Sequence, residues 1–146
     1  MNNQVKKFWY EFWEGNPPVE EVEAWNFGFE ADVLADLVMH GIKRATTPGY
    51  IFYELENEPL PTVGQYDVIL NSHEEPVCIV KTTDIQIMPF NEVPESYARI
   101  EGEGDLSYEY WKTGHEAFFK KECLEYGIEY EEKMLVVCWF FELAKK

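Results

Sequence analysis

Lys43 and Arg44 are the only formally cationic residues between Lys7 and Lys81, although acidic residues occur throughout that interval. Both follow a segment expected to be helical, and the negative end of a helix dipole favours cations, so one interpretation is a helix cap with no further role. The other interpretation includes Thr46, because a lysine beside a hydroxyl can act as base and nucleophile if the chain bends to bring them together. Spacing alone leaves both interpretations open.

A second group of candidate residues is the acidic loop EGEGD at positions 101–105. Its three carboxylates alternate with glycines as in an oxygen-ligand metal loop, but the later bidentate glutamate of a calcium EF-hand is missing, so no metal is expected. Asp105 is expected to be the N-cap of a helix that begins at the next residue. We expect Glu101 to lie close to Lys43 and Glu103 to be more exposed, since alternate residues of an extended loop point to opposite sides.

His115 and two aromatic residues complete the candidate site. His115 follows Trp111 by four residues, which places it on the apolar face of a helix, either as a core histidine or as a ligand contact. Trp25 and Phe27 lie in an expected loop, where they either close the core or stack on a ligand. No HExxH, GxSxG, P-loop or Rossmann glycine pattern is present, which excludes the usual zinc protease, serine hydrolase and nucleoside triphosphate sites.

Hydrophobic periodicity predicts the elements that must position these residues. Helices are expected over 4–14, 30–40, 47–56 and 106–126, and strands over 65–71, 77–88 and 135–143. Thr47 is the expected N-cap of the short third helix, with Pro48 at its first position. The first two strands form a predicted hairpin, and all three belong to one mainly antiparallel sheet or small β-barrel with helices packed outside. The predicted class is α+β.

Composition narrows the function classes. The chain has 146 residues, 46% of them hydrophobic, and a formal net charge of -16. The length and composition predict a single globular domain. Its averaged electric field repels long duplex nucleic acid and anionic membranes, but the net charge is compatible with binding of a small ligand or a few nucleotides. We expect neither a signal peptide nor a membrane span, and the three cysteines are expected to be reduced. We therefore expect a cytoplasmic protein; the sequence leaves its oligomeric state open.

The candidate residues belong to motifs through which the sequence resembles the ASCH-domain family, small proteins with a PUA-like β-barrel. These motifs are AWNFG at 24–28, GIKRAT at 41–46, EPLPTVGQ at 58–65, EPVCIVKTTDI at 75–85, PFNEV at 89–93 and EGEGDLSYEYWKTGHEAFF at 101–119. The resemblance implies one PUA-like domain over residues 1–146, with an amino-terminal helical extension at about 4–14.

The resemblance also implies a cleft beside the barrel that binds RNA or a nucleotide-like ligand, with Lys43 matching the lysine of the family's G-x-K-x-x-T element. A nucleoside, a nucleotide or short single-stranded RNA is the expected partner, and no cofactor is expected. Stacking on an aromatic ring and a contact from a cation to a phosphate or carbonyl would hold such a ligand. The ligand-binding residues expected in the cleft are Trp25, Phe27, Arg44, Glu103, Trp111 and His115.

Some relatives are amidohydrolases that remove an acyl group from acetylcytidine with a threonine, a lysine and a glutamate, and others are ribonucleases. The first set matches Thr46, Lys43 and Glu101 as expected catalytic residues. In this hypothesis the Thr46 hydroxyl attacks the amide carbonyl, Lys43 accepts the proton, and Glu101 positions Lys43 or delivers a proton to the leaving amine. A third hypothesis is a non-catalytic protein-interaction module whose aromatic residues all belong to the core.

Overall fold

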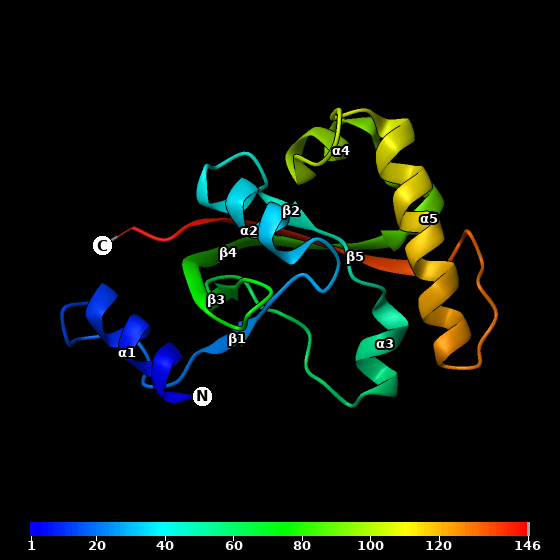
Figure 1. Cartoon of the computed structure of the whole chain (residues 1–146). Coiled ribbons are helices and arrows are strands. Elements are labelled where there is room, and N and C mark those ends of the chain that lie inside the picture. Colours follow the sequence, from blue (N-terminus) through cyan, green and yellow to red (C-terminus); the bar gives the residue numbers. More distant parts are fainter. Residues whose placement is uncertain (146) are drawn as a thin grey trace.

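A five-stranded mixed sheet lies at the centre of the structure (Figure 1), a computed structural model that describes residues 1–145. Its strand order is β1-β3-β4-β5-β2. The bounds are β1 Glu23–Trp25, β2 Ala45–Thr46, β3 Tyr66–Leu70, β4 Pro76–Pro89 and β5 Leu135–Leu143. The predicted hairpin is confirmed as β3–β4, and β5 has the predicted bounds. Lys146, the last residue of the predicted domain, lies outside the described residues.

The α+β class is confirmed, whereas the predicted closed barrel is not formed by the described residues. Strand β1 pairs in parallel with β3, which makes the sheet mixed, and β2 pairs with β5 at the opposite edge. These edge strands have three and two residues. They are too short to continue the backbone pairing around a barrel, because each strand residue adds only about 3.3 Å of length.

Within the described residues, five α-helices and one 3-10 helix surround the sheet (Figure 1). They are α1 Asn3–Phe12, α2 Ala31–Met39, α3 Tyr50–Leu55, η1 Phe90–Glu92, α4 Glu95–Glu101 and α5 Tyr108–Glu125. Helix α4 and η1 were not predicted. Two predicted caps are wrong: the N-cap of α3 is Gly49 rather than Thr47, and that of α5 is Ser107, whose hydroxyl accepts the N–H of Tyr110. Asp105 instead accepts the N–H of Ser107.

Hydrophobic clusters attach the helices to the sheet. On α1, Val5 and Trp9 are buried against Val68 of β3 and Ile79 of β4. Buried residues of α2 meet β3, β4 and β5 in a second cluster, and those of α4 and α5 meet β5 in a third. Within residues 1–145 no helix has the length and apolar character needed to cross a membrane. This packing places β2, the edge strand of the sheet, against α4, and the residues on either side of β2 reach the candidate site with it.

Candidate ligand-binding cavity

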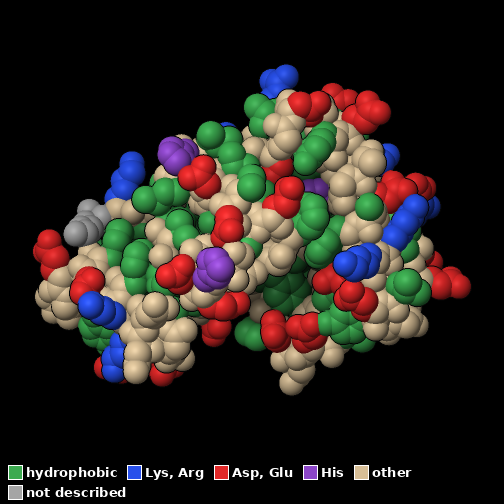
Figure 2. All heavy atoms as spheres, in the orientation of Figure 1, with side chains coloured by type: hydrophobic (Ala, Val, Ile, Leu, Met, Phe, Trp, Pro, Cys, Tyr) green, Lys and Arg blue, Asp and Glu red, His purple; other side chains and the backbone are tan. Residues whose placement is uncertain are grey.

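A cavity of about 830 Å³ opens between the sheet, α3 and α5. Its volume falls within the roughly 300–1,000 Å³ of small-molecule sites. Figure 2 shows the hollow with hydrophobic side chains in its depth and acidic side chains around it. The aromatic residues that line it are Trp25, Phe27, Phe29, Phe52, Tyr53, Tyr110, Trp111, Phe118 and Trp139.

The ionisable residues of the cavity are almost all acidic. Apart from Tyr53 and Tyr110, they are Glu23, Glu56, Glu58, Asp67, Glu101, Glu103, Glu122 and His115, and no lysine or arginine is among the described residues that line it. Burial, with the nearby Glu125 and Glu56 charges, raises the pKa of Glu122 to about 7. The wall of this cavity therefore disfavours anions such as phosphate.

At one end of the cavity, Lys43 and Glu101 form a buried ion pair. Lys43 Nζ lies 2.7 Å from Glu101 Oε1, from Glu103 Oε2 and from the carbonyl oxygen of Ala45. An ammonium has three N–H donors, so these three acceptors use its whole donor capacity. The predicted proximity of Glu101 and Lys43 is confirmed. Glu103 is the more exposed acid, as predicted, at 23% of its side chain against 1% for Glu101, but it pairs with Lys43 as well.

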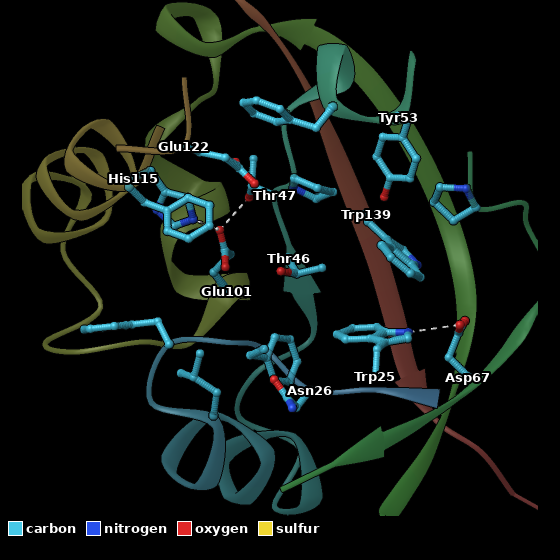
Figure 3. A pocket seen from close by; sticks show the side chains of 18 of the residues that line it. Trp25, Asn26, Thr46, Thr47, Tyr53, Asp67, Glu101, His115, Glu122 and Trp139 are labelled. Carbon is cyan, nitrogen blue, oxygen red and sulfur yellow. Dashed lines mark hydrogen bonds and ion pairs between the residues drawn. The ribbon is translucent and has the colours of Figure 1, made fainter. Parts of the chain in front are cut away.

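The second carboxylate oxygen of Glu101 is equally well occupied. Glu101 Oε2 accepts hydrogen bonds from Thr47 Oγ1 at 2.5 Å and Trp111 Nε1 at 2.6 Å, and it lies 2.9 Å from His115 Nε2. Burial alone would raise the pKa of this carboxyl, but the Lys43 and His115 charges outweigh burial and hold it well below its ordinary value. Glu101 is therefore an ionised residue that organises this end of the cavity (Figure 3).

Gly102 allows the ends of α2 and α4 to come this close. Its φ is 73°, in the left-handed region, and a Cβ at this position would lie 2.3 Å from the carbonyl oxygen of Ile42 and 2.9 Å from Lys43 Cα. Any side chain here would force the two backbones apart. Glu101 is the last residue of α4 rather than part of an extended loop, so the alternation argument for EGEGD does not describe its geometry.

His115 is held between two acceptors. Its Nδ1 lies 2.8 Å from the Trp111 carbonyl oxygen and its Nε2 lies 2.9 Å from Glu101 Oε2. Only the imidazolium form donates from both nitrogens. Burial opposes that form, but the charge and hydrogen bond of Glu101 raise the pKa of His115. His115 therefore balances part of the buried negative charge while its ring stacks on Trp111 at 4.6 Å.

Asp67, on β3, lies at the other end of the cavity (Figure 3). It is 1% exposed, and its oxygens accept one hydrogen bond each, from Trp25 Nε1 at 3.1 Å and from Gln65 Nε2 at 2.9 Å. Burial raises the pKa of Asp67 to about 6, although these two hydrogen bonds oppose the shift. The Trp25 ring packs 5.3 Å from Trp139. This end is thus aromatic, and its buried acid has no cationic partner among the described residues.

The family model of the ASCH domain matches residues 23–145. The chain belongs to the ASCH domain family. It is similar to the ASCH domain from Lactobacillus crispatus JV V101, with a TM-score of 0.91 and 32% sequence identity over 98% of this chain and 95% of that chain. It is also similar to protein EF3133 from Enterococcus faecalis V583, with a TM-score of 0.89 and 37% identity over 99% of this chain and 90% of that chain. No curated protein matches the sequence.

Within this ASCH domain the predicted catalytic residues are only partly brought together. Thr46 lines the cavity between its two ends (Figure 3). No hydrogen bond joins the Thr46 hydroxyl to Lys43 in the described part of the chain, and Lys43 Nζ is surrounded by other acceptors. Thr47, which the sequence assigned to a helix cap, is the threonine that contacts Glu101. The arrangement therefore holds Lys43 as a charged, positioning group and leaves it no free lone pair to act as a base.

The predicted ligand-binding residues also divide into two sets. Trp25, Phe27, Glu103, Trp111 and His115 line the cavity, and their contacts with a ligand stay a prediction. Arg44 does not line it: its side chain is exposed, and its backbone N–H donates to the Ile100 carbonyl. Alternating side chains on the short extended segment explain this correction, because Lys43 points inward and its neighbour outward.

Sequence reasoning missed Asp67 of β3, Gln65 immediately before that strand and Trp139 of β5, which line one cavity only in the folded chain. An acidic residue inside the apolar run of β3 was the available signal, since a buried acid needs partners. No group of three or more histidine, cysteine, aspartate or glutamate residues within 1–145 is arranged to hold a metal ion.

Proposed function

We propose that this ASCH domain binds a nucleoside, or one unpaired base of RNA, and that the sugar-phosphate backbone stays outside the cavity. The observation that carries the proposal is the combination of an aromatic cavity of about 830 Å³ with a wall that has seven acids and, among its described residues, no lysine or arginine. A planar, uncharged ring with polar edges matches both properties. A phosphate group matches neither.

Trp25 is the best stacking surface for such a ring. It is half-buried and lines the cavity, and its indole N–H is anchored on Asp67, which fixes the orientation of the ring. Phe27 is less available, because the Lys43 ammonium lies 5.2 Å from the centre of its ring. Stacking on an aromatic side chain contributes about 1–3 kcal/mol per base. Loss of this one tryptophan should therefore lower the affinity measurably.

The carboxylates favour the base and disfavour the phosphate. Asp67 and Glu103 present acceptor oxygens to a ligand, and amino and ring N–H groups of bases are donors. A phosphate brought into the same space would meet uncompensated negative charge. Binding is therefore expected to weaken with each added phosphate, in contrast to proteins that hold nucleic acid through its backbone.

The amidohydrolase hypothesis receives less support from this geometry. It needs Lys43 to accept a proton from Thr46, but the Lys43 ammonium is fixed on two carboxylates and a carbonyl. Before it could act as a base, the ion pair with Glu101 would have to open and leave a buried charge unpaired. Binding is the function that the arrangement supports best.

Calorimetric titration of the full chain with nucleosides, nucleoside 5′-monophosphates and short single-stranded RNA tests the proposal. We expect nucleosides to bind more tightly than the matching monophosphates, with little dependence on salt. Trp25→Ala should lower the affinity about tenfold or more. Trp13→Ala is the matched control, because Trp13 packs with α1 and Tyr66 and does not line the cavity.

Two results would contradict the proposal. Preference for monophosphates or long duplexes over nucleosides would show that a backbone-binding surface elsewhere dominates. Equal loss of affinity from Trp25→Ala and Trp13→Ala, with both variants folded, would show that the cavity does not hold the base.

A further inference from the structure

Asp67 differs from the other buried acid of the cavity in the number of partners it has. Glu101 receives hydrogen bonds or ion pairs from four side chains, whereas Asp67 receives two, both from uncharged groups. A carboxylate offers about four acceptor sites. Asp67 therefore keeps acceptor capacity that the protein itself does not use, although it is almost completely buried.

The charged groups around Asp67 do not supply this missing partner. Glu23 of β1 faces it and adds negative charge. Tyr53 of α3 is close enough for its own pKa to be raised by Asp67, after the larger effect of burial. Because none of these groups is a cation, the carboxylate is stabilised only by Trp25 and Gln65, and a ligand that brings donors would be the missing partner.

The position of Asp67 determines which part of a ligand it can meet. Trp25 donates to Asp67 Oδ1 and forms the aromatic wall beside it, so a ring stacked on Trp25 would direct one edge toward the carboxylate. Two adjacent N–H groups on that edge would match two carboxylate oxygens, as in other bidentate contacts. An edge that carries acceptors would instead be repelled.

We propose that Asp67 selects the base, and that the preferred ligand is a planar, phosphate-free heterocycle whose edge carries two adjacent N–H donors, the arrangement found in guanine. This inference rests on the proposed nucleoside-binding function. Guanine offers its ring N1–H and its 2-amino group side by side. Inosine lacks the 2-amino group, 1-methylguanosine lacks the ring donor, and adenosine has an unprotonated N1 beside its amino group.

Titration of the unmodified full chain with these four nucleosides is the first test, because it needs no variant. We expect guanosine to bind about tenfold or more tightly than inosine, 1-methylguanosine or adenosine, since each of them loses a hydrogen bond to a charged acceptor. An oligouridine that carries one guanine is a parallel arm. If it shows the same preference over plain oligouridine, an RNA base is the source of the ligand; if guanosine alone shows it, the source is the free nucleoside.

The second test is Asp67→Asn, with Asp84→Asn as its control. Asp84 is an exposed acid on β4 that pairs with Gln86 and does not line the cavity. We expect Asp67→Asn to lower guanosine affinity about tenfold while adenosine affinity changes little, and Asp84→Asn to change neither.

The outcomes separate the two proposals. Nucleosides that bind with no preference for guanosine, or a preference that Asp67→Asn leaves intact, would overturn the role of Asp67 while the nucleoside-binding function stands. Absence of binding by every nucleoside would overturn both. Circular dichroism shows whether Asp67→Asn is folded. If the variant is not folded, the titration of the unmodified chain with the four nucleosides decides whether guanosine is preferred.

Discussion

The two ends of the cavity use a buried carboxylate in opposite ways. At the α4–α5 end, Glu101 is surrounded by Lys43, Thr47, Trp111 and His115, and its pKa is held well below the ordinary value. At the sheet end, Asp67 has no cationic partner among the described residues, and burial raises its pKa to about 6. A saturated carboxylate stabilises structure, whereas an undersatisfied one costs stability and is available to a ligand.

This difference assigns a structural role to Glu101 and a ligand-recognition role to Asp67. Glu101 holds together segments that are 58 residues apart in sequence, so its loss should affect folding first. Asp67 belongs to a strand that pairs on both sides without help from its side chain, so its loss should affect recognition first. Changes at each end therefore should be measured for both stability and binding.

The largest effect is expected from Glu101→Gln. The substitution leaves the buried Lys43 ammonium and His115 without their common counterion, and breaking a buried ion pair typically costs about 3–5 kcal/mol. Urea denaturation at pH 7 measures the change in free energy of unfolding. Glu103→Gln is the matched control and should cost less, because Glu103 is partly exposed and Lys43 keeps Glu101 as its counterion. Equal losses of stability from the two substitutions would show that the contacts of Glu101 contribute no more to folding than those of Glu103.

The next largest effect concerns the pH dependence of Asp67→Asn. The pKa of Asp67 is about 6 in the folded chain against an ordinary value of 3.8, so the native state binds more protons between these values. Stability contributed by Asp67 therefore falls as pH rises from about 4 to 6, by on the order of 3 kcal/mol. Asn cannot titrate and removes this loss.

Urea denaturation of both proteins at several pH values measures this effect. The altered hydrogen bonds to Gln65 and Trp25 change the stability of the variant by an amount that does not depend on pH. Relative to wild type, the variant should therefore gain stability as the pH rises from about 4 to 6. A difference between the two proteins that does not change from pH 4 to 7 would show that Asp67 is not desolvated. Asp84→Asn provides the exposed-acid reference.

A smaller effect distinguishes the two neighbouring threonines. Thr47→Val removes a hydroxyl that donates to the ionised Glu101 carboxylate and should cost about 1.5–3 kcal/mol. Thr46→Val removes a half-buried hydroxyl for which the described residues provide no hydrogen-bond partner, so its cost should stay within about 0.5 kcal/mol. Thermal denaturation compares the pair. A larger loss of stability from Thr46→Val than from Thr47→Val would show that the Thr46 hydroxyl, rather than the Thr47 hydroxyl, stabilises Glu101.

Arg44→Ala should have the smallest effect. The side chain is exposed and outside the cavity, so nucleoside affinity should change less than about twofold, a difference of about 0.4 kcal/mol. The same calorimetric titration measures it. A tenfold loss would show that Arg44 folds over the ligand and would restore its predicted role.

Local patterns in the sequence were sufficient to predict most of the secondary structure. Helices α2 and α5, the β3–β4 hairpin and β5 were predicted because their hydrophobic periodicity is contained within each segment. Helix α4 has seven residues, too few to show a hydrophobic period; the six-residue α3 was predicted from the Thr47-Pro48 start pattern instead. The closed barrel was wrong because closure depends on the edge strands β1 and β2, whose three and two residues have no pattern of their own.

The sequence also predicted one long-range contact, between Lys43 and Glu101. The prediction rested on the family resemblance, which places Lys43 and the acidic loop at one cleft, and on the expectation that carboxylates facing a phosphate-binding cleft are paired with its cations. It did not identify the third partner: Thr47 followed by proline is equally typical of a helix N-cap, so only the structure showed that its hydroxyl donates to Glu101. Nor did it show that Arg44, adjacent to Lys43, points away from the cavity.

The tertiary structure alone decided which carboxylate is saturated and which is not. Composition predicts an acidic surface, but it assigns the same charge to Glu101 and Asp67. Their opposite pKa shifts arise because the segment between α2 and β2 brings a lysine and α5 brings a histidine to Glu101. Asp67 receives only a tryptophan from β1 and a glutamine from the residue before β3. Desolvation and hydrogen bonding depend on neighbours in space, and these neighbours come from separate elements that meet only when the chain folds.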